Sequence, residues 1–73
     1  MKYRIINKRC GDRAEANRIC KSLQDKVHAP YVFHSESTGA WLVVLYDADR
    51  MSLAQKAQAH YMEIGLKAFI QIY

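Results

Sequence analysis

The sequence has no long apolar run. None of its hydrophobic stretches approaches the ~20 residues that a membrane-spanning helix requires, and the stretch that follows Arg4 is too short to be a secretory signal. We therefore expect a cytoplasmic protein without a membrane partner.

The sequence also has few groups suited to covalent or metal chemistry. Cys10 and Cys20 are the only cysteines; we place the first in a loop and the second inside a helix, too far apart for a disulfide. His28, His34 and His60 do not have the spacing of a zinc site. We predict a protein that is not an enzyme and that binds no metal or cofactor.

Cys10 leaves one reactive alternative open. It lies beside Arg9 and Arg13, close to the expected start of a helix, and cations and a helix N-terminus both lower a thiol pKa. We prefer to interpret it as a passive loop cysteine.

Charge is not concentrated in one part of the chain. Eleven Lys and Arg against seven Asp and Glu give a net charge of +4, but the basic residues are spread along the sequence. This permits a polyanionic partner without indicating one. Hydrophobic residues make up 51% of the 73 residues, which is typical of a globular protein with room for one core. We expect one domain, residues 1–73.

The chain contains one internal repeat. A shift of 38 positions places Ile5 on Val43, Ala16 on Ala54 and Val32 on Ile70, so that residues 3–34 resemble residues 41–73. Each half is predicted to form a strand, a helix and a second strand. The predicted strands are residues 3–8, 31–34, 41–46 and 68–73.

Helix signals lie between these strands. Asp12 is the expected N-cap of the first helix, with Glu15 completing a capping box. Gly65 is the expected C-cap of the second helix, for which Asp49 or Ser52 is the expected N-cap. Apolar residues at helical spacing predict two buried stripes, which comprise Ala16, Ile19, Cys20, Leu23 and Val27 in the first helix and Ala54, Ala57, Tyr61 and Ile64 in the second.

The order βαββαβ predicts an α+β fold with two layers, the ferredoxin-like sandwich. Two helices cover one face of a four-stranded antiparallel sheet. Strand alternation predicts that the helix-covered face receives Ile5, Val32, Val43, Leu45, Ile70 and Ile72. The open face then receives Arg4, Ile6, Lys8, Tyr31, Phe33, Leu42, Val44, Tyr46, Phe69, Gln71 and Tyr73. A register slip of one residue would exchange the two sets.

The second half resembles the SPOR domain family. The likeness lies in residues 41–46, the alanine-rich helix at residues 54–61 and the segment 65–70, with Ile5, Ala16 and Leu23 in the first half. Ile6 stands where the family usually has glutamine, and Arg9-Cys10-Gly11 replaces its Gly-x-Phe turn. The resemblance implies the βαββαβ fold and, as a minor alternative, binding of peptidoglycan glycan strands through the open face.

The apolar open face predicts a binding function, because large exposed apolar patches mark interaction sites. We first predict a small accessory or inhibitory protein of the phage-encoded kind, which contacts a partner protein or a second copy of itself. The expected contact residues are Ile6, Tyr31, Phe33, Leu42, Val44, Tyr46, Phe69 and Tyr73. The alternative is single-stranded nucleic acid, with Tyr31 and Phe33 stacking on bases and Arg4 and Lys8 contacting phosphates.

Overall fold

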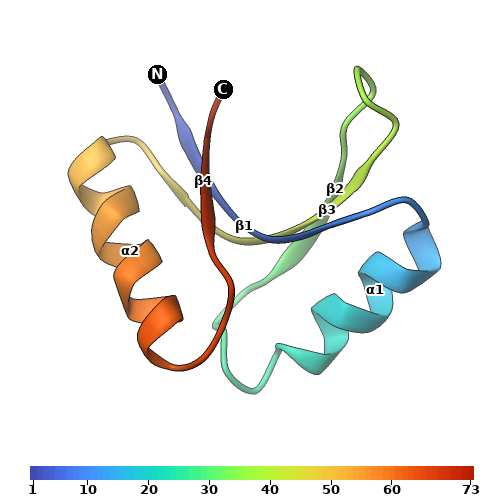
Figure 1. The fold of residues 1–73 in the computed structure, drawn as a ribbon, viewed down its shortest axis with the longest axis horizontal. Helices are drawn as coiled ribbons and strands as arrows, with labels where there is room; N and C mark the ends of the chain where they lie inside the picture. The colour runs from blue at the N-terminus through green and yellow to red at the C-terminus, as the bar shows by residue number, and fades with distance from the viewer.

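The computed structural model describes all 73 residues and has the element order β1 (Tyr3–Cys10), α1 (Arg13–Ser22), β2 (Tyr31–His34), β3 (Trp41–Ala48), α2 (Met51–Glu63) and β4 (Phe69–Ile72). All strand pairs are antiparallel, in the order β2-β3-β1-β4. This confirms the α+β, ferredoxin-like βαββαβ fold. The two chain ends and the tip of the β2–β3 hairpin lie on the same side of the molecule, at the top of Figure 1 and away from α1.

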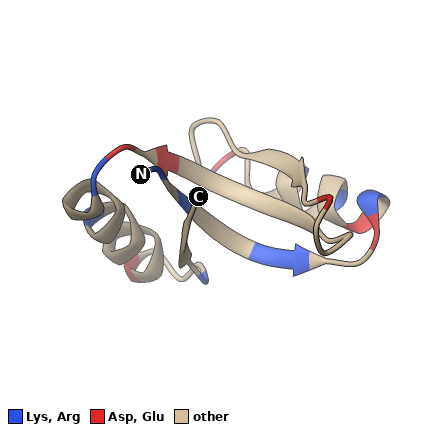
Figure 2. Cartoon of the chain, turned by 90° about the horizontal axis from the view of Figure 1, so that it is seen from above, with Lys and Arg blue, Asp and Glu red and all other residues tan.

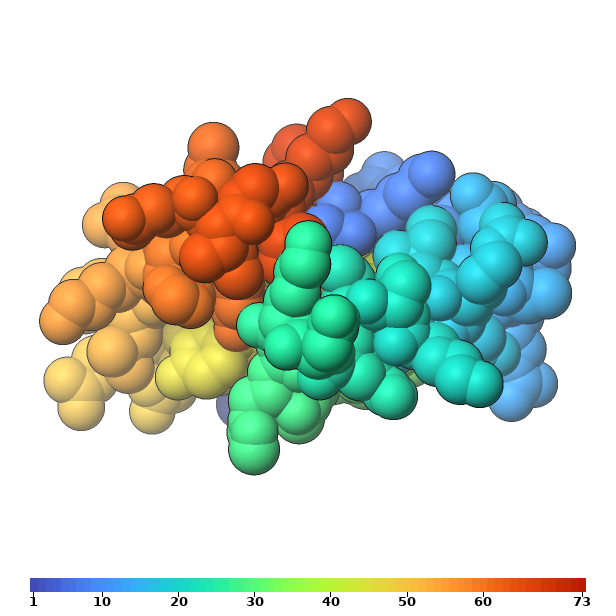
Figure 3. Space-filling view, turned by 90° about the horizontal axis from the view of Figure 1, so that it is seen from below, coloured from blue at the N-terminus to red at the C-terminus, as the bar shows by residue number.

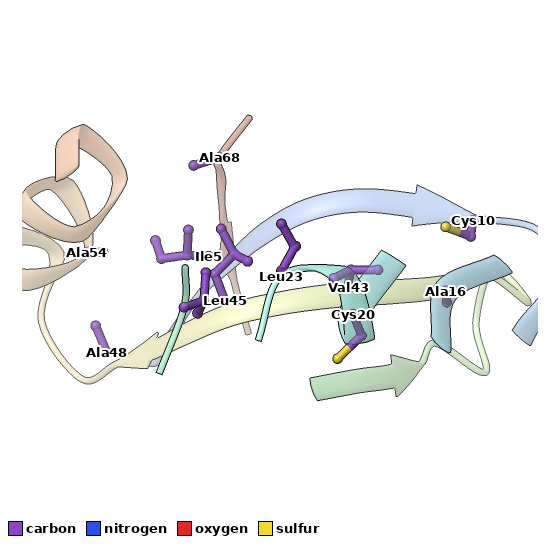
Figure 4. Close-up of a cluster of buried hydrophobic side chains, with 11 residues drawn as sticks. Ile5, Cys10, Ala16, Cys20, Leu23, Val43, Leu45, Ala48, Ala54 and Ala68 are labelled. Atoms are coloured by element: carbon purple, nitrogen blue, oxygen red, sulfur yellow. The ribbon is translucent and has the colours of Figure 1, made fainter. Parts of the chain in front are cut away.

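The core lies between the sheet and the helices. Ile5, Val43 and Leu45 meet Ala16, Cys20 and Leu23 of the α1 region and Ala54 of α2 there (Figure 4). Val32 and Ile70 pack against this cluster, as expected. Ile72 does not, because it lies on an edge strand and is 53% exposed.

The two helices do not contact each other. α1 packs on β1, β2 and β3, and α2 packs on β1, β3 and β4. Seen from below, the segment between α1 and β2 fills the space between them (Figure 3). Val27 of this segment is 2% exposed, so it joins the predicted stripe although α1 has already ended at Ser22.

The helix ends are only partly as predicted. Asp12 caps α1 by accepting a hydrogen bond from the Ala14 amide at 3.0 Å, but Glu15 forms an ion pair with Lys8 at 3.5 Å. Arg50 occupies the N-cap of α2, and its side chain forms no capping hydrogen bond. The prediction that Asp49 or Ser52 caps this helix is therefore wrong.

At the C-terminus of α2, Gly65 adopts a φ of +90°. The Gly65 amide donates to Met62 O and the Leu66 amide to Tyr61 O, as in a Schellman motif. Leu66 then packs on the core, whereas Ile64 is 40% exposed and was wrongly placed in the buried stripe.

Neither helix is long and apolar enough to cross a membrane.

Candidate binding surface on the open sheet face

Two β-bulges decide which side chains reach the open face. Ile5 pairs with Tyr46 but Ile6 pairs with Val44, so Leu45 is an extra residue in β3. Lys8 pairs with Val43, which makes Asn7 an extra residue in β1. Each bulge reverses the alternation of the residues beyond it.

The bulges correct two predicted site residues. Directly opposed residues share a face, so Lys8 lies with Val43 on the helix side, where it pairs with Glu15. Tyr46 lies with Ile5 on that side too, and lines a hollow with residues of α2 such as Leu53 and Tyr61.

Arg9 and Asp47 take the places on the open face that Lys8 and Tyr46 were expected to fill. Arg9 pairs with Leu42 and lines a hollow with Ile6 and Phe69, and Asp47 pairs with Arg4. Neither position could be predicted, because Arg9 and Asp47 were both assigned to turns that follow strands.

The centre of the open face is a second, small core. Ile6, Leu42 and Val44 form a cluster in which each side chain is at most 5% exposed, although no helix covers them. Their cover is made of other side chains from the same sheet. The face is therefore less apolar at its surface than alternation alone predicts.

Arg4 is the one charged residue that is buried, at 7% exposure, and it lies on the same face. Its guanidinium lies between two aromatic rings, 4.0 Å from the centroid of Phe33 and 3.8 Å from that of Tyr73. Phe33 belongs to β2 and Tyr73 follows β4, which are the two opposite edges of the sheet. One side chain of β1 therefore links the two opposite edges of the sheet across its open face.

Asp47 completes the network. Its carboxylate lies 3.7 Å from Arg4 Nε and accepts hydrogen bonds from the hydroxyls of Tyr31 and, at 3.2 Å, Tyr73. Burial and the bond to Asp47 raise the pKa of Tyr31 to about 12. We call Arg4, Asp47, Tyr31 and Tyr73 the clasp, because they tie together β1, β3, β2 and the chain end beyond β4.

Four aromatic side chains remain open to solvent around this centre. Tyr31 is 36% exposed, Phe33 37%, Tyr73 48% and Phe69 58%. We call these four residues the aromatic rim. Of the predicted contact residues the structure thus places Tyr31, Phe33, Phe69 and Tyr73 at the surface, Ile6, Leu42 and Val44 beneath it, and Tyr46 elsewhere.

Two hollows flank Gln71 on the open face. One, of about 350 Å³, is lined by Ile6, Arg9 and Phe69 together with β4. The other, of about 290 Å³, lies between the hairpin and the chain end. Its lining comprises Arg4, Phe33, Ser35, Glu36, Ser37, Gln71, Ile72 and Tyr73.

Not every buried polar atom on this face has a hydrogen-bond partner. Arg4 Nε and Gln71 Oε1 are buried without a hydrogen-bond partner, and the two residues are opposed across β1 and β4. Viewed from above, the charged residues lie toward the strand ends and most of the sheet is uncharged (Figure 2).

The groups considered for chemistry are separate from this face. Cys10 and Cys20 are buried and unbridged. Burial raises the pKa of both thiols, and Glu15 raises that of Cys10 further, which contradicts the reactive alternative for Cys10. No three His, Cys, Asp or Glu side chains lie close enough together to hold a metal ion.

No protein-family model, curated protein or solved structure matches the chain. The likeness to SPOR domains stays a prediction.

Proposed function

We propose that the protein is a non-enzymatic binding module, a small accessory or inhibitory protein, that contacts protein through the aromatic rim. The observation that carries this proposal is the exposure of four aromatic side chains on a sheet face without a helix layer. Tyr and Phe are enriched at protein interfaces, where they supply large contact areas at a small cost in side-chain entropy.

The charge of the open face favours a protein over a nucleic acid. Arg4 is paired with Asp47, and Lys8 lies on the helix side with Glu15. Arg9 and Glu36 line the two hollows and balance each other. Nucleic-acid binding rests on an excess of positive charge that neutralises phosphates, and on this face only Lys2, which is opposed to Tyr73 at the chain ends, adds to these balanced charges.

The buried thiols support the non-enzymatic part of the proposal. A thiol is a nucleophile only as thiolate, and the pKa of Cys10 and that of Cys20 are both raised. Two of the histidines pack against aromatic neighbours, since His34 stacks on Trp41 and His60 lies edge-on to Tyr61.

Single-stranded nucleic acid is the second candidate. The exposed rings of Tyr31 and Phe33 favour it, because bases stack on such rings with little regard to sequence. Glycan binding rests only on the SPOR resemblance.

Photo-crosslinking from the rim tests the proposal. A benzophenone amino acid replaces Phe69, which is 58% exposed on the open face, or Met62, which is 59% exposed on α2. We expect protein adducts in the host cell from position 69 and few from the matched position 62. Equal adducts at both positions, or none, would count against the rim as the contact surface.

A salt series separates the two candidates. If the protein proposal is right, fluorescence anisotropy with a labelled oligonucleotide detects no salt-sensitive binding. Binding that falls steeply with salt and is lost in Phe33→Ala would instead select the nucleic-acid alternative.

A further inference from the structure

We propose that the partner on the open face is a second copy of this chain, related by a two-fold axis, with Phe69 of each copy seated in the hairpin groove of the other. The hairpin groove is the hollow of about 290 Å³ between the β2–β3 hairpin and the chain end. This inference rests on the proposed function and names its partner.

Phe69 is the projecting group. It is the first residue of β4, an edge strand, and it is the most exposed aromatic side chain in the protein. Its ring stands beside Ile6 and Arg9 at one hollow of the open face. Removing this apolar surface from water favours association.

The hairpin groove has room for an aromatic ring, and three of its eight lining residues are hydrophobic. Two of its walls are the rings of Phe33 and Tyr73, and both rings have exposed surface left for a further contact. A dry apolar cavity of about 150 Å³ is enough to bind benzene, so a groove of about 290 Å³ has room for the ring of Phe69.

The projecting group and the groove lie on the same face, which suits a closed two-fold dimer. In a face-to-face dimer, an axis that bisects the line from Phe69 to the groove places each ring in the opposite groove. Gln71 lines both hollows and therefore lies near that axis. The two insertions are equivalent, so the assembly ends at two copies.

The charges beside these features are complementary. Arg9 lies at the Phe69 end and Glu36 at the groove end, and neither forms an ion pair within its own chain. The same docking brings Arg9 of each copy toward Glu36 of the other. Opposed charges of this kind fix the register of an interface more than they add affinity.

The proposed dimer needs only a modest part of the accessible surface of each chain. A standard interface buries about 800 Å² on each partner, roughly a sixth of the 4977 Å² of accessible surface of one chain. The aromatic rim draws on both edge strands, so its residues span the full width of the sheet face.

Charge reversal measured by analytical ultracentrifugation tests the arrangement. The full chain should sediment as a dimer, and Arg9→Glu and Glu36→Arg should each raise the dissociation constant at least tenfold. An equimolar mixture of the two variants should regain dimers, because the heterodimer contains one native pair and one reversed pair. Circular dichroism checks that each variant is folded, which is expected since both side chains are exposed.

Phe69→Asp tests the insertion of the Phe69 ring into the hairpin groove. It should abolish the dimer, and Met62→Asp should leave it intact. A wild-type chain that stays monomeric at every concentration, a dimer that survives Phe69→Asp, or a mixture that does not recover would each overturn the inference.

The proposed function can survive that failure. A monomer that still crosslinks from position 69 to a different protein refutes the second copy but not the binding module, whereas a monomer without any protein adduct refutes both.

Discussion

The two faces of the sheet bury apolar side chains by different means. On the helix side, Ile5 and Val43 are covered by Ala16, Ala54 and other residues of the α1 and α2 layer. On the open side, Leu42 and Val44 are just as buried, but their cover is a layer of polar and aromatic side chains that includes Arg4 and Phe33. A helix layer presents alanines and aliphatic groups inward. The open side instead presents the guanidinium of Arg4, which lies between the rings of Phe33 and Tyr73.

The comparison teaches that the open face has an inner and an outer layer of side chains. Its inner residues contribute to stability, because they are shielded from water. Its outer residues are available to a partner, because they keep between a third and three fifths of their surface. Substitutions should therefore separate stability from binding according to depth.

The largest effect is expected at the inner layer. Val44→Asp places an unpaired carboxylate at a position that is 0% exposed, and should cost more than about 4 kcal/mol of unfolding free energy. Phe69→Asp, on the same face, should cost less than about 1 kcal/mol in the monomer. Urea denaturation followed by circular dichroism measures both. A folded, near-native Val44→Asp would show that the open face has no inner layer.

A smaller effect is expected in the clasp itself. Arg4→Ala removes two ring contacts and uncovers the small core, so we expect a loss of about 2 kcal/mol. Arg18→Ala, at an exposed position of α1, is the control and should change stability by less than about 0.5 kcal/mol. Equal losses would mean that Arg4 covers nothing. Protein concentration is held constant, because dimerisation adds to apparent stability.

The Tyr31–Asp47 bond predicts a pH dependence. The pKa of Tyr31 is raised from 10.0 to about 12, so the fold favours the neutral phenol. Its contribution to stability is complete below pH 10 and is lost as the pH rises from 10 to about 12.

Tyr31→Phe isolates this contribution. It should cost about 1 kcal/mol at neutral pH, and its difference from wild type should vanish near pH 12. A difference that stays constant across this range would mean that the hydroxyl does not bond to Asp47 in the folded protein.

The smallest effects distinguish two adjacent basic residues on opposite faces, Lys8 and Arg9, because the bulge decides which of them lies on the open face. Lys8→Ala should lower stability by about 0.5 kcal/mol at most, through the exposed pair with Glu15, and leave self-association unchanged. Arg9→Ala should leave the stability of the monomer unchanged and weaken self-association. The reverse result would place the extra residue of β1 elsewhere than at Asn7.

Much of the fold could be predicted from the sequence, for local reasons. Apolar residues at helical spacing and the Asp12 cap identify α1, and Gly65 marks the end of α2 because only glycine adopts its positive φ without strain. The strands were recognised from β-branched and aromatic runs.

The site could be predicted only in part, because a β-bulge has no local sequence signature here. The extra residues Asn7 and Leu45 reversed the expected positions of Lys8 and Tyr46. The clasp joins residues that are far apart in sequence, such as Arg4, Asp47 and Tyr73, so no local pattern predicts it. Alternation predicts which face a side chain is on, but not what covers it.

A dilution series of amide NMR spectra tests most directly the claim that two copies of the chain meet through the open face. Between concentrated and dilute samples, we expect shifts to change at Phe33, Phe69 and Tyr73 and to stay constant along α1 and α2. Changes that cluster instead around Leu53 and Met62 of α2, or spectra that do not depend on concentration, would contradict the account.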